Sequence, residues 1–385
     1  MKFGAIDIGT NAARLLVGEV CYDGDHAYVK KHSYSRIPLR LGDEVFDQGR
    51  LSKKKIDQFI DCIQAFKLIA HIFEVEQLRA VATSAMREAS NGIKVQEKIK
   101  EKTGVNIEII TGQVEAELIF GTFFLVDFDK THPFIVVDVG GGSTEISVFE
   151  NGQKRASRSF ELGTIRMLRG KVSKKIWTDI SSWIEAEVDS SIPHRLFGTG
   201  GNINKVHKMV GLKDKDSLSV AKMNPLLNKL SKLTVEERID QFQLKPDRAD
   251  VIVPALEIYL FVMAKLGIQQ IDVPKIGLSD GMIYDMYLKS QVLSGTTTFN
   301  LPWTIWTQVL DSNWIYYYLC TSNAPVAELV DALDSKSCSF GSAGSIPARG
   351  TKNQSEKQSE SDVRTLVFFV YPSLKQSEKE SESGA

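Results

Sequence analysis

Residues 3–9 and residues 134–140 share one pattern, and the two stretches lie 131 residues apart. Each is an apolar run that ends in Asp-x-Gly, and each is followed by small polar residues and a second apolar run. Two apolar runs joined by a glycine turn predict a β-hairpin. A hairpin that recurs at this distance predicts two homologous α/β domains. We therefore expect two related domains whose turns face each other across a cleft.

Length and charge agree with this organisation. The 385 residues exceed what one ordinary hydrophobic core supports. An apolar content of 43% and a charged content of 25% are typical of a soluble globular protein. The net charge of −1 provides no overall field toward nucleic acid or a membrane surface, so we expect neither as a partner. Backbone N–H groups and a few arginines can still bind phosphate on a neutral protein.

The sequence offers little sign of an oxidising or membrane environment. The four cysteines show no CxxC spacing, which favours a reduced protein. The first seven residues read as a strand rather than as a signal sequence. No apolar run reaches the roughly 18–20 residues of a membrane helix. These observations predict a cytoplasmic protein.

Apolar periodicity divides residues 1–292 into further elements. It predicts helices at about 56–69, 85–100, from 114, 176–188, 204–210, 235–242, 247–266 and 280–288, and strands at about 78–83, 106–110 and 270–276. Ser52 is a plausible N-cap for the first of these helices. The repeat then places the first domain at 1–125 and the second at 126–292.

Residues 293–385 do not conform to the repeat. Residues 297–320 are rich in Trp and Tyr without a period, and residues 351–361 and 373–385 are rich in Ser, Lys, Glu and Gln, which predicts disorder. Residues 326–333 and 343–349 resemble the translation of a transfer-RNA gene, with a leucine-type D-arm and a T-arm. One hypothesis is that frameshift or readthrough joined this tail to the chain; the alternative is a genuine disordered tail. A locus without an overlapping transfer-RNA gene would exclude the first.

The two turns carry the residue types that bind phosphate and a hard cation. Glycine allows successive N–H groups to point one way because it lacks Cβ and tolerates positive φ. The expected phosphate-binding groups are Gly140, Gly141, Gly142, Ser143 and Thr144 in the second turn, and Gly9, Thr10 and Asn11 in the first. Asp7 and Asp138 suit Mg²⁺, which prefers one or two carboxylates with phosphate oxygens and waters. The alternatives are plain hairpin turns with aspartates that only cap them.

Seven ordered motifs resemble the exopolyphosphatase/guanosine pentaphosphate phosphatase family, which belongs to the actin/hexokinase/Hsp70 ATPase superfamily. The first is residues 7–16 (DIGTNAARLL) and the second is residues 138–145 (DVGGGSTE). The others are 39–42 (LRLG), 82–91 (ATSAMREASN), 162–166 (LGTIR), 198–201 (GTGG) and 248–254 (RADVIVP). The resemblance spans about residues 1–290. It implies two ribonuclease-H-like (actin-like ATPase) α/β domains that flank a central cleft.

The resemblance also implies roles for individual residues. Glu115 aligns with the carboxylate that orients the attacking water, although a first-turn Glu that complements a helix dipole is the alternative. Arg87 aligns with an arginine that contacts phosphate, or is a solvated helix residue. Glu145 aligns with a carboxylate associated with metal or water, or belongs to a cross-strand pair. Gly200 and Gly201 would bind a nucleotide or a distal phosphate at a helix N-terminus, or form a simple strand-to-helix turn.

Four positions depart from the family pattern. Val114 and Glu117 stand where the family has Glu and Arg, and Ser279 and Asp280 stand where it has Arg and Glu. Two arginines are thus missing. The helical region that follows the second domain in long family members has no counterpart after residue 292. We therefore expect poor processivity on long polyphosphate.

The leading functional hypothesis is a Mg²⁺-dependent phosphatase that acts on inorganic polyphosphate or on the 5′ end of guanosine pentaphosphate. The sequence does not rank these two substrates. A nucleotide or alarmone sensor with slow or no hydrolysis is the alternative that the missing arginines favour. A small-molecule kinase of the same superfamily would need an acceptor site, for which no residues stand out. Homodimers are common in what the chain resembles, so a homodimer is expected among the partners.

Overall fold

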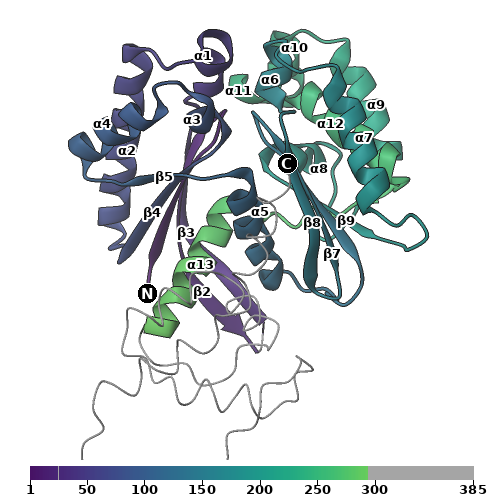
Figure 1. The fold of residues 1–385 in the computed structure, drawn as a ribbon, viewed down its shortest axis with the longest axis horizontal. Coiled ribbons are helices and arrows are strands. Elements are labelled where there is room, and N and C mark those ends of the chain that lie inside the picture. Colours follow the sequence, from purple (N-terminus) through teal and green to yellow (C-terminus); the bar gives the residue numbers. More distant parts are fainter. Residues whose placement is uncertain (25, 294–385) are drawn as a thin grey trace, which may run out of the picture. The chain divides into compact units, whose positions relative to one another are not determined.

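The computed structural model describes residues 1–24 and 26–293, and these form two α/β domains (Figure 1). The expectations for the tail, including the segments that resemble a transfer-RNA gene, lie outside the described residues. Each domain has a sheet with helices packed against it. Among the residues described, no helix is long and apolar enough to cross a membrane.

The first sheet has five strands in the order β3-β2-β1-β4-β5. Their bounds are β1 (Phe3–Ile8), β2 (Ala13–Asp23), β3 (His26–Ile37), β4 (Gln77–Ala82) and β5 (Ile107–Ile109). The first three strands are antiparallel, and β4 and β5 run parallel to β1. The second sheet has the order β8-β7-β6-β9. Its strands are β6 (Phe134–Val139), β7 (Thr144–Glu150), β8 (Gln153–Phe160) and β9 (Arg195–Thr199).

The recurrent hairpin is confirmed in residue-level detail. In the first domain β1 pairs antiparallel with β2, and in the second β6 pairs antiparallel with β7. Each turn closes by the same backbone hydrogen bond, from Gly9 N–H to the Ala12 carbonyl (3.1 Å) and from Gly140 N–H to the Ser143 carbonyl (2.9 Å). Each sheet continues with a strand parallel to the first strand of its hairpin. The two domains therefore share a supersecondary unit, as the repeat predicted.

Helices cover the outer face of each sheet, and the alternation of side chains along the strands decides which face is outer. In the first domain Ile6 and Ile8 pack against α2 (Lys53–Ile72) and α4 (Gly92–Thr103). α1 (Leu41–Gln48) and α3 (Ser84–Glu88) lie at the end of this sheet where the strands reach the hairpin turn. Ser52 caps α2 by accepting a hydrogen bond from Lys55 N–H, as expected.

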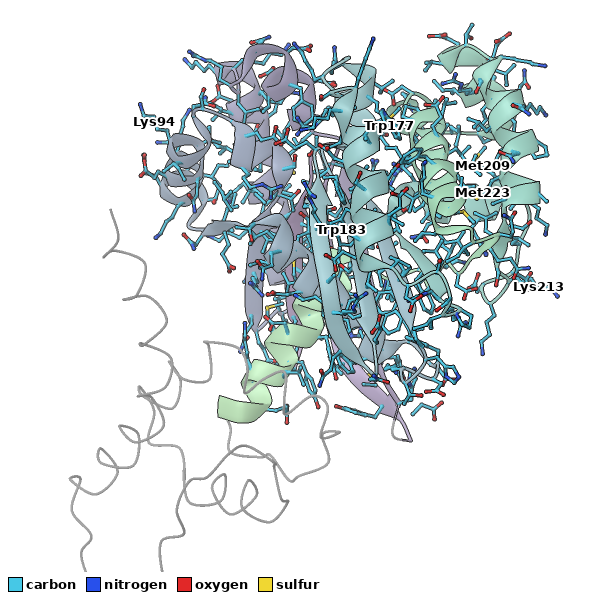
Figure 2. All side chains as sticks on the ribbon, turned by 45° about the vertical axis from the view of Figure 1, so that its right-hand side comes forward. Lys94, Trp177, Trp183, Met209, Lys213 and Met223 are labelled. Carbon is cyan, nitrogen blue, oxygen red and sulfur yellow. The ribbon has the colours of Figure 1, made fainter. Side chains whose placement is uncertain are left out.

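The second sheet packs its outer face against a larger helical layer. Ile135, Val137 and Val139 lie in one apolar cluster with residues of that layer. The helices are α6 (Thr164–Leu168), α7 (Lys175–Glu187), α8 (Gly201–Met209), α9 (Val220–Ser231), α10 (Val235–Phe242), α11 (Pro246–Ala249) and α12 (Ile252–Leu266). A two-stranded sheet of β10 (Leu218–Ser219) and β11 (Gln270–Ile271) joins them. Trp177 and Trp183 of α7, labelled in Figure 2, contact Phe261 and Phe160 edge-on.

The inner faces of both sheets meet one shared cluster. Phe3 and Ala5 of β1 and Phe134 and Val136 of β6 lie in it with α5 (Gly112–Gly121), η1 (Thr122–Leu125) and α13 (Leu278–Leu293). Both α5 and α13 are drawn between the two sheets in Figure 1. α13 packs on β1 and β2 of the first domain. The expected boundary had assigned this last helix to the second domain, whereas the chain returns to the first.

Several predicted elements differ in extent. The helix expected at 85–100 is divided into α3 and α4 because Ala89 is extended and the Asn91 side chain binds the Leu51 backbone. The helix expected at 247–266 is divided into α11 and α12. α9 was not predicted, since Pro225 lies inside it. The strands β3, β8 and β9 were also missed, and they complete the sheets beside the hairpins.

Candidate active site

A cavity of about 500 Å³ lies between the turns of the two hairpins. Both turns line it, together with the N-terminus of α8 and the segment that leads into α13. Its lining includes most of the residues expected from the sequence: Asp7, Gly9, Thr10, Asn11, Glu115, Asp138, Gly140, Gly141, Gly142, Ser143, Gly200 and Gly201. Residues from distant parts of the chain thus meet at one polar site.

Strand alternation directs both motif aspartates toward the inner side of the sheets. Asp7 shares the face of Phe3 and Ala5, and Asp138 shares the face of Phe134 and Val136. This is the side on which α5 packs. Each aspartate is the last polar residue before its glycine turn, so it lies at the mouth of that turn. Because these turns were expected to bind phosphate, residues 9–11 are called the first phosphate loop and residues 140–143 the second.

α5 carries Glu115 into the space between these aspartates. Thr111 begins the helix, because its hydroxyl accepts a hydrogen bond from Val114 N–H (3.3 Å). A Cβ atom on Gly112 would lie 2.5 Å from Ser159 Cβ, so only glycine lets the helix approach β8 this closely. Glu115 is only 9% exposed. Within the described part of the chain its Oε2 atom has no hydrogen-bond partner.

Three acidic groups share this buried region, and burial disfavours their charged forms. Burial, then Glu145, Asp138 and Asp7, raise the pKa of Glu115 well above its ordinary value. Burial and then Asp138 raise the pKa of Glu145 to about 7. Burial raises the pKa of Asp138 to about 6. A group of carboxylates with raised pKa values in a cavity is a typical sign of an acid–base or cation-binding site.

The residue opposite the motif aspartate differs between the two hairpins. Arg14 pairs with Asp7 across the first hairpin, and its Nη1 atom lies 2.5 Å from Asp7 Oδ2. The equivalent position in the second hairpin holds Glu145, directly opposite Asp138. The Glu145 carboxylate accepts a hydrogen bond from Ser159 Oγ (2.7 Å). One half of the site is therefore internally neutralised, while the other half concentrates negative charge.

The second phosphate loop is packed too tightly for any residue other than glycine. A Cβ atom on Gly142 would lie 2.2 Å from Ser84 Oγ and 2.9 Å from Thr10 Oγ1. The buried Arg166 donates from Nε to the Gly142 carbonyl (2.8 Å) and from Nη2 to Glu88 Oε1 (2.5 Å). Arg166 thereby holds one loop carbonyl and links the loop to the first domain.

Backbone N–H groups hold the first loop in a similar way. Arg40 N–H donates to the Asn11 carbonyl (2.8 Å), and Gly42 N–H donates to the Thr10 carbonyl (3.0 Å). The Asn11 side chain donates from Nδ2 to the Asp247 carbonyl (3.0 Å). The two loop carbonyls are therefore satisfied by protein, and the Thr10 and Asn11 residues remain at the cavity wall.

The N-terminus of α8 forms a third wall of the cavity. Gly200 has φ of 97°, and a Cβ there would lie 2.6 Å from Asp138 Oδ1. The Arg248 guanidinium lies against Gly201 and donates from Nη1 to Asn202 Oδ1 (2.6 Å). Burial, with Arg36 and Arg14 nearby, lowers the pKa of Arg248 to about 10. A helix N-terminus beside a partly buried guanidinium is a typical place for an anion to bind.

Cations also line the cavity around the start of α13. Lys31 is 43% exposed and lies 2.7 Å from Asp280 Oδ1, and Lys275 is 41% exposed. Arg36 forms an ion pair with the Asp247 carboxylate. By contrast, the wall near the phosphate loops is made of buried residues such as Thr10, which is 3% exposed. The cavity is therefore open on the lysine side and closed at the loops.

Three expected site residues lie outside this lining. Arg87 donates from Nη1 to the Ile110 carbonyl (2.7 Å) and acts on Glu115 and Glu145 through its charge. The Thr144 hydroxyl donates to the Leu162 carbonyl (2.5 Å), so it is engaged in the second domain. Glu145 lines a separate small cavity of about 10 Å³ with Asp138. That volume is about the size of one water molecule.

The carboxylates at the cavity bear on whether a divalent cation could bind there. Among residues 1–24 and 26–293, no three His, Cys, Asp or Glu side chains converge as a metal site. One oxygen of Asp7 is taken by Arg14. Asp138 Oδ1 is buried and has no hydrogen bond of good geometry to a described residue, although burial raises the pKa of this carboxyl and the nearby Thr199 hydroxyl lowers it somewhat. A single free carboxylate fits Mg²⁺, which keeps several waters and takes its other ligands from substrate phosphates.

Sequence reasoning missed most of the cations of the cavity. Arg14 and Arg248 lie in two of the sequence motifs, residues 7–16 and 248–254, so membership of a motif could have identified them as site residues. Lys31, Arg36 and Lys275 lie in β3, or just before α13, without a motif of their own. These three cations reach the cavity only through the packing of β3 and of the second domain, which sequence spacing does not reveal.

Comparison with known proteins agrees with this geometry. The pattern of the Ppx/GppA phosphatase family matches residues 31–290, which is most of the chain. The chain belongs to the Ppx/GppA phosphatase family. The resemblance seen in the sequence is thereby confirmed.

Solved family structures also match. The Aquifex aeolicus family member has 24% identity and a TM-score of 0.60, covering 75% of this chain and 98% of that one. An exopolyphosphatase from Cytophaga hutchinsonii has 23% identity and a TM-score of 0.65, with the same coverage. These structures confirm the two-domain actin-like fold.

Relatives that carry different names match about three quarters of this chain. Exopolyphosphatase 1 of Mycobacterium leprae is 25% identical over 303 residues, which cover 74% of this chain and 88% of that protein. A guanosine-5′-triphosphate,3′-diphosphate pyrophosphatase of Aliivibrio fischeri is 24% identical over 297 residues, which cover 74% of this chain and 59% of that protein.

Proposed function

We propose that this family member hydrolyses phosphoanhydride bonds and releases the terminal phosphate of inorganic polyphosphate, of the 5′ end of guanosine pentaphosphate, or of both. The observation that carries the proposal is the placement of Glu115. Its unpartnered carboxylate oxygen, among the described residues, is buried in a cavity lined by two phosphate loops. A buried carboxylate of raised pKa is a stronger base than an exposed one, so in its ionised form it is suited to take a proton from water.

The proposed reaction begins with a water molecule between Glu115 and the terminal phosphorus. Glu115 accepts one proton while the water oxygen forms a bond to phosphorus. The bond to the bridging oxygen breaks, and that oxygen leaves with the electron pair as the new chain end. Arg14 and Arg248 line the cavity and offset negative charge on the phosphate groups. Glycine N–H groups of the second loop bind the oxygens of the transferred group.

A divalent cation, Mg²⁺ in our proposal, would be held by Asp138 with substrate oxygens and waters. When bound, it neutralises charge on the phosphate oxygens and orients the phosphate chain. Glu145 would act on it through the small cavity that it shares with Asp138. Asp7, which we expected as a third ligand, instead keeps Arg14 in place at the cavity wall.

The closed end of the cavity supports attack on a chain end rather than on internal bonds. Thr10 and Ser143 are 3% and 6% exposed, whereas Lys31 and Lys275 on the other side are both more than 40% exposed. A phosphate chain would enter past the lysines and stop at the loops. An exopolyphosphatase and a guanosine-5′-triphosphate,3′-diphosphate pyrophosphatase have similar identity to this chain, 25% and 24%, so both substrates remain in the proposal. Low processivity is also proposed.

A sensor that binds these substrates but hydrolyses them slowly is the second candidate. The sensor is favoured by the two positions where the family has arginine and this chain has Glu117 and Ser279. Glu117 is exposed and pairs with Lys154 (3.1 Å) instead of supplying positive charge, and Ser279 is buried at the cavity wall. Against it stands Glu115, which retains the geometry of a base.

Phosphate release by the purified full chain distinguishes these candidates. Polyphosphate and guanosine pentaphosphate are each supplied with Mg²⁺ or with a chelator. We expect Mg²⁺-dependent release, and we expect Glu115→Gln to lower kcat by about 10²–10⁴-fold. Glu117→Gln is the matched control, because this exposed residue lies on the same helix, and its kcat should stay within about twofold of the wild type. Full activity in Glu115→Gln would exclude the mechanism, and tight binding without turnover in the wild type would favour the sensor.

A further inference from the structure

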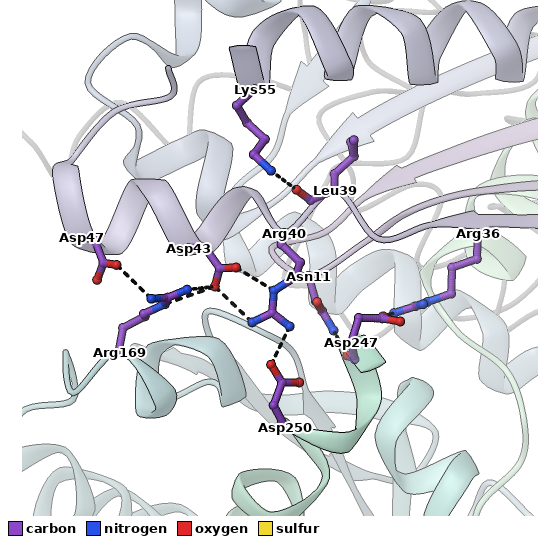
Figure 3. A network of polar contacts seen from close by, with 10 residues as sticks. All are labelled: Asn11, Arg36, Leu39, Arg40, Asp43, Asp47, Lys55, Arg169, Asp247 and Asp250. Atoms are coloured by element: carbon purple, nitrogen blue, oxygen red, sulfur yellow. Dashed lines mark hydrogen bonds and ion pairs between the residues drawn. The ribbon is translucent and has the colours of Figure 1, made fainter. Parts of the chain in front are cut away.

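A network of ion pairs joins the two domains beside the first phosphate loop (Figure 3). Arg40 of the first domain contacts Asp43 through Nε (2.6 Å) and reaches Asp250 of the second domain through Nη1 (2.7 Å). Arg169 of the second domain contacts Asp43 (2.8 Å) and Asp47 (3.1 Å). Burial opposes ionisation of Asp43, yet the hydrogen bonds from Arg40 and Arg169 lower its pKa below the ordinary value.

Arg40 also holds the first phosphate loop through its backbone. Its N–H donates to the Asn11 carbonyl (2.8 Å), two residues before Gly42 N–H donates to the Thr10 carbonyl. Arg40 has φ of 50°, an uncommon conformation for a residue with a side chain. The same residue therefore binds the loop with its main chain and Asp250 with its side chain.

On the second domain, α11 and its C-cap supply the partners. The Asp247 carbonyl accepts from Asn11 Nδ2 (3.0 Å), and the Asp247 carboxylate pairs with Arg36. Arg248 lines the cavity, and Asp250 is the C-cap residue that meets Arg40. Asp247 thus contacts the first loop, Arg248 lines the cavity, and Asp250 contacts Arg40.

Neither Arg40 nor Asp250 is among the residues that line the cavity. A role in the reaction would therefore act through other residues. The ion pair fixes α11 against the segment that holds Asn11 and Thr10. Because Arg248 lies on α11, the same contact sets the position of its guanidinium relative to the first loop.

We infer that Arg40 and Asp250 are positioning residues for polyphosphate binding. Their ion pair across the domains holds the first phosphate loop and Arg248 at the separation that lets both contact one phosphate chain. Small displacements of binding groups cost large factors in effective binding and rate. The inference rests on the proposed function, because it assigns the pair to the binding of that substrate.

The experiment replaces Asp250 in the full chain with Asn, which removes the charge and keeps the shape. We expect the KM for tripolyphosphate to rise about fivefold, the factor that corresponds to a partly exposed ion pair, while kcat stays within about twofold. Arg40→Asn should have the same effect, since Asn tolerates the backbone conformation at this position. The double variant should resemble either single variant rather than show their product.

Glu108→Gln is the matched control. It removes one member of the ion pair between Glu108 and Arg79 (2.8 Å), and both residues belong to the first sheet. Its KM should equal that of the wild type. Thermal unfolding of Asp250→Asn and Glu108→Gln separates a positioning effect from a general loss of stability.

Amide hydrogen exchange provides a readout that needs no turnover. The N–H groups of Arg40 and Gly42 hold the loop, so they should exchange faster in Asp250→Asn and at the wild-type rate in Glu108→Gln. Unchanged exchange together with unchanged KM overturns the inference. So does a lower kcat and a lower melting temperature at constant KM, which indicates a structural role. Faster exchange in a chain that hydrolyses neither substrate supports the linkage and rejects the proposed function alone.

Discussion

Arg14 and Glu145 occupy the same place in the two hairpins, each directly across the strand pair from a motif aspartate. The same scaffold position thus carries a cation in one domain and an anion in the other. Arg14 neutralises Asp7, whereas Glu145 adds to the charge beside Asp138. In our proposal the first domain therefore adds a cation to the substrate site, while the second domain contributes its glycine loop and would hold the metal.

Substitution of Glu145 should affect Mg²⁺ binding, and substitution of Arg14 should affect substrate binding. We expect Glu145→Gln to raise the Mg²⁺ concentration that gives half-maximal activity by about tenfold, as for other groups that act on a metal from outside its ligands. Arg14→Gln should leave that concentration unchanged and raise the substrate KM roughly tenfold, because it removes a cation from the cavity wall. Titrations of each variant with Mg²⁺ and with substrate check both. Equal effects on both ligands would contradict the assignment.

The pH dependence of activity should report the buried carboxylates. Glu115 must be ionised to accept a proton, and its raised pKa moves the loss of activity on the acid side to a higher pH than an ordinary glutamate would give. Because Glu145 is one cause of that shift, Glu145→Gln should move the acid limb of kcat/KM to lower pH. Rate measurements from pH 5 to 9 at saturating Mg²⁺ test this. An acid limb that stays in place would show that the two groups do not interact.

Stability should depend on pH through Asp138. Burial raises its pKa from an ordinary value of 3.8 to about 6, so the folded protein opposes its ionisation. The resulting loss of stability is absent below the ordinary pKa, where the group is neutral in both states, and is complete above about pH 6. Asp138→Asn should therefore stabilise the chain by about 3 kcal/mol at pH 7.5, which corresponds to the rise in pKa from 3.8 to about 6, and by almost nothing at about pH 3. Urea unfolding in the presence of a chelator measures the difference, and a variant that is less stable at pH 7.5 would refute it.

Contact between the two phosphate loops should be intolerant of even one methyl group. In Gly142→Ala the new Cβ would clash with Ser84 and Thr10, so the loops must separate. We expect kcat/KM to fall by about 10²-fold, since both loops bind the same phosphate chain. Gly121→Ala is the control, because no described atom lies within 4 Å of the added Cβ. Wild-type activity in Gly142→Ala would mean that the loops do not act together.

Local pattern was sufficient to predict the parts of the fold that depend on neighbouring residues. The glycine turns after Asp7 and Asp138 determine the two hairpins, and the structure contains both. Glu115 was found only through its motif, because a first-turn glutamate has the same local pattern whether it faces solvent or a cavity.

Other features depend on contacts between distant segments, which sequence spacing does not encode. Arg36 meets Asp247 and Arg40 meets Asp250 only because α11 packs against the first domain. The Thr144 hydroxyl resembled a phosphate ligand in sequence, but the β7 register points it at the Leu162 carbonyl. The division of the helix at Ala89 likewise depends on the distant Leu51 backbone.

The return of α13 to the first sheet has a consequence for synthesis on the ribosome. Leu278, Met282 and Ile283 cover part of the inner face that Phe3 and Leu16 present, so that part stays bare until residue 283 has been translated. The domain that emerges first is therefore completed by a helix that emerges after the second sheet. A nascent chain halted before residue 278 would expose this apolar face to chaperones and to other nascent chains.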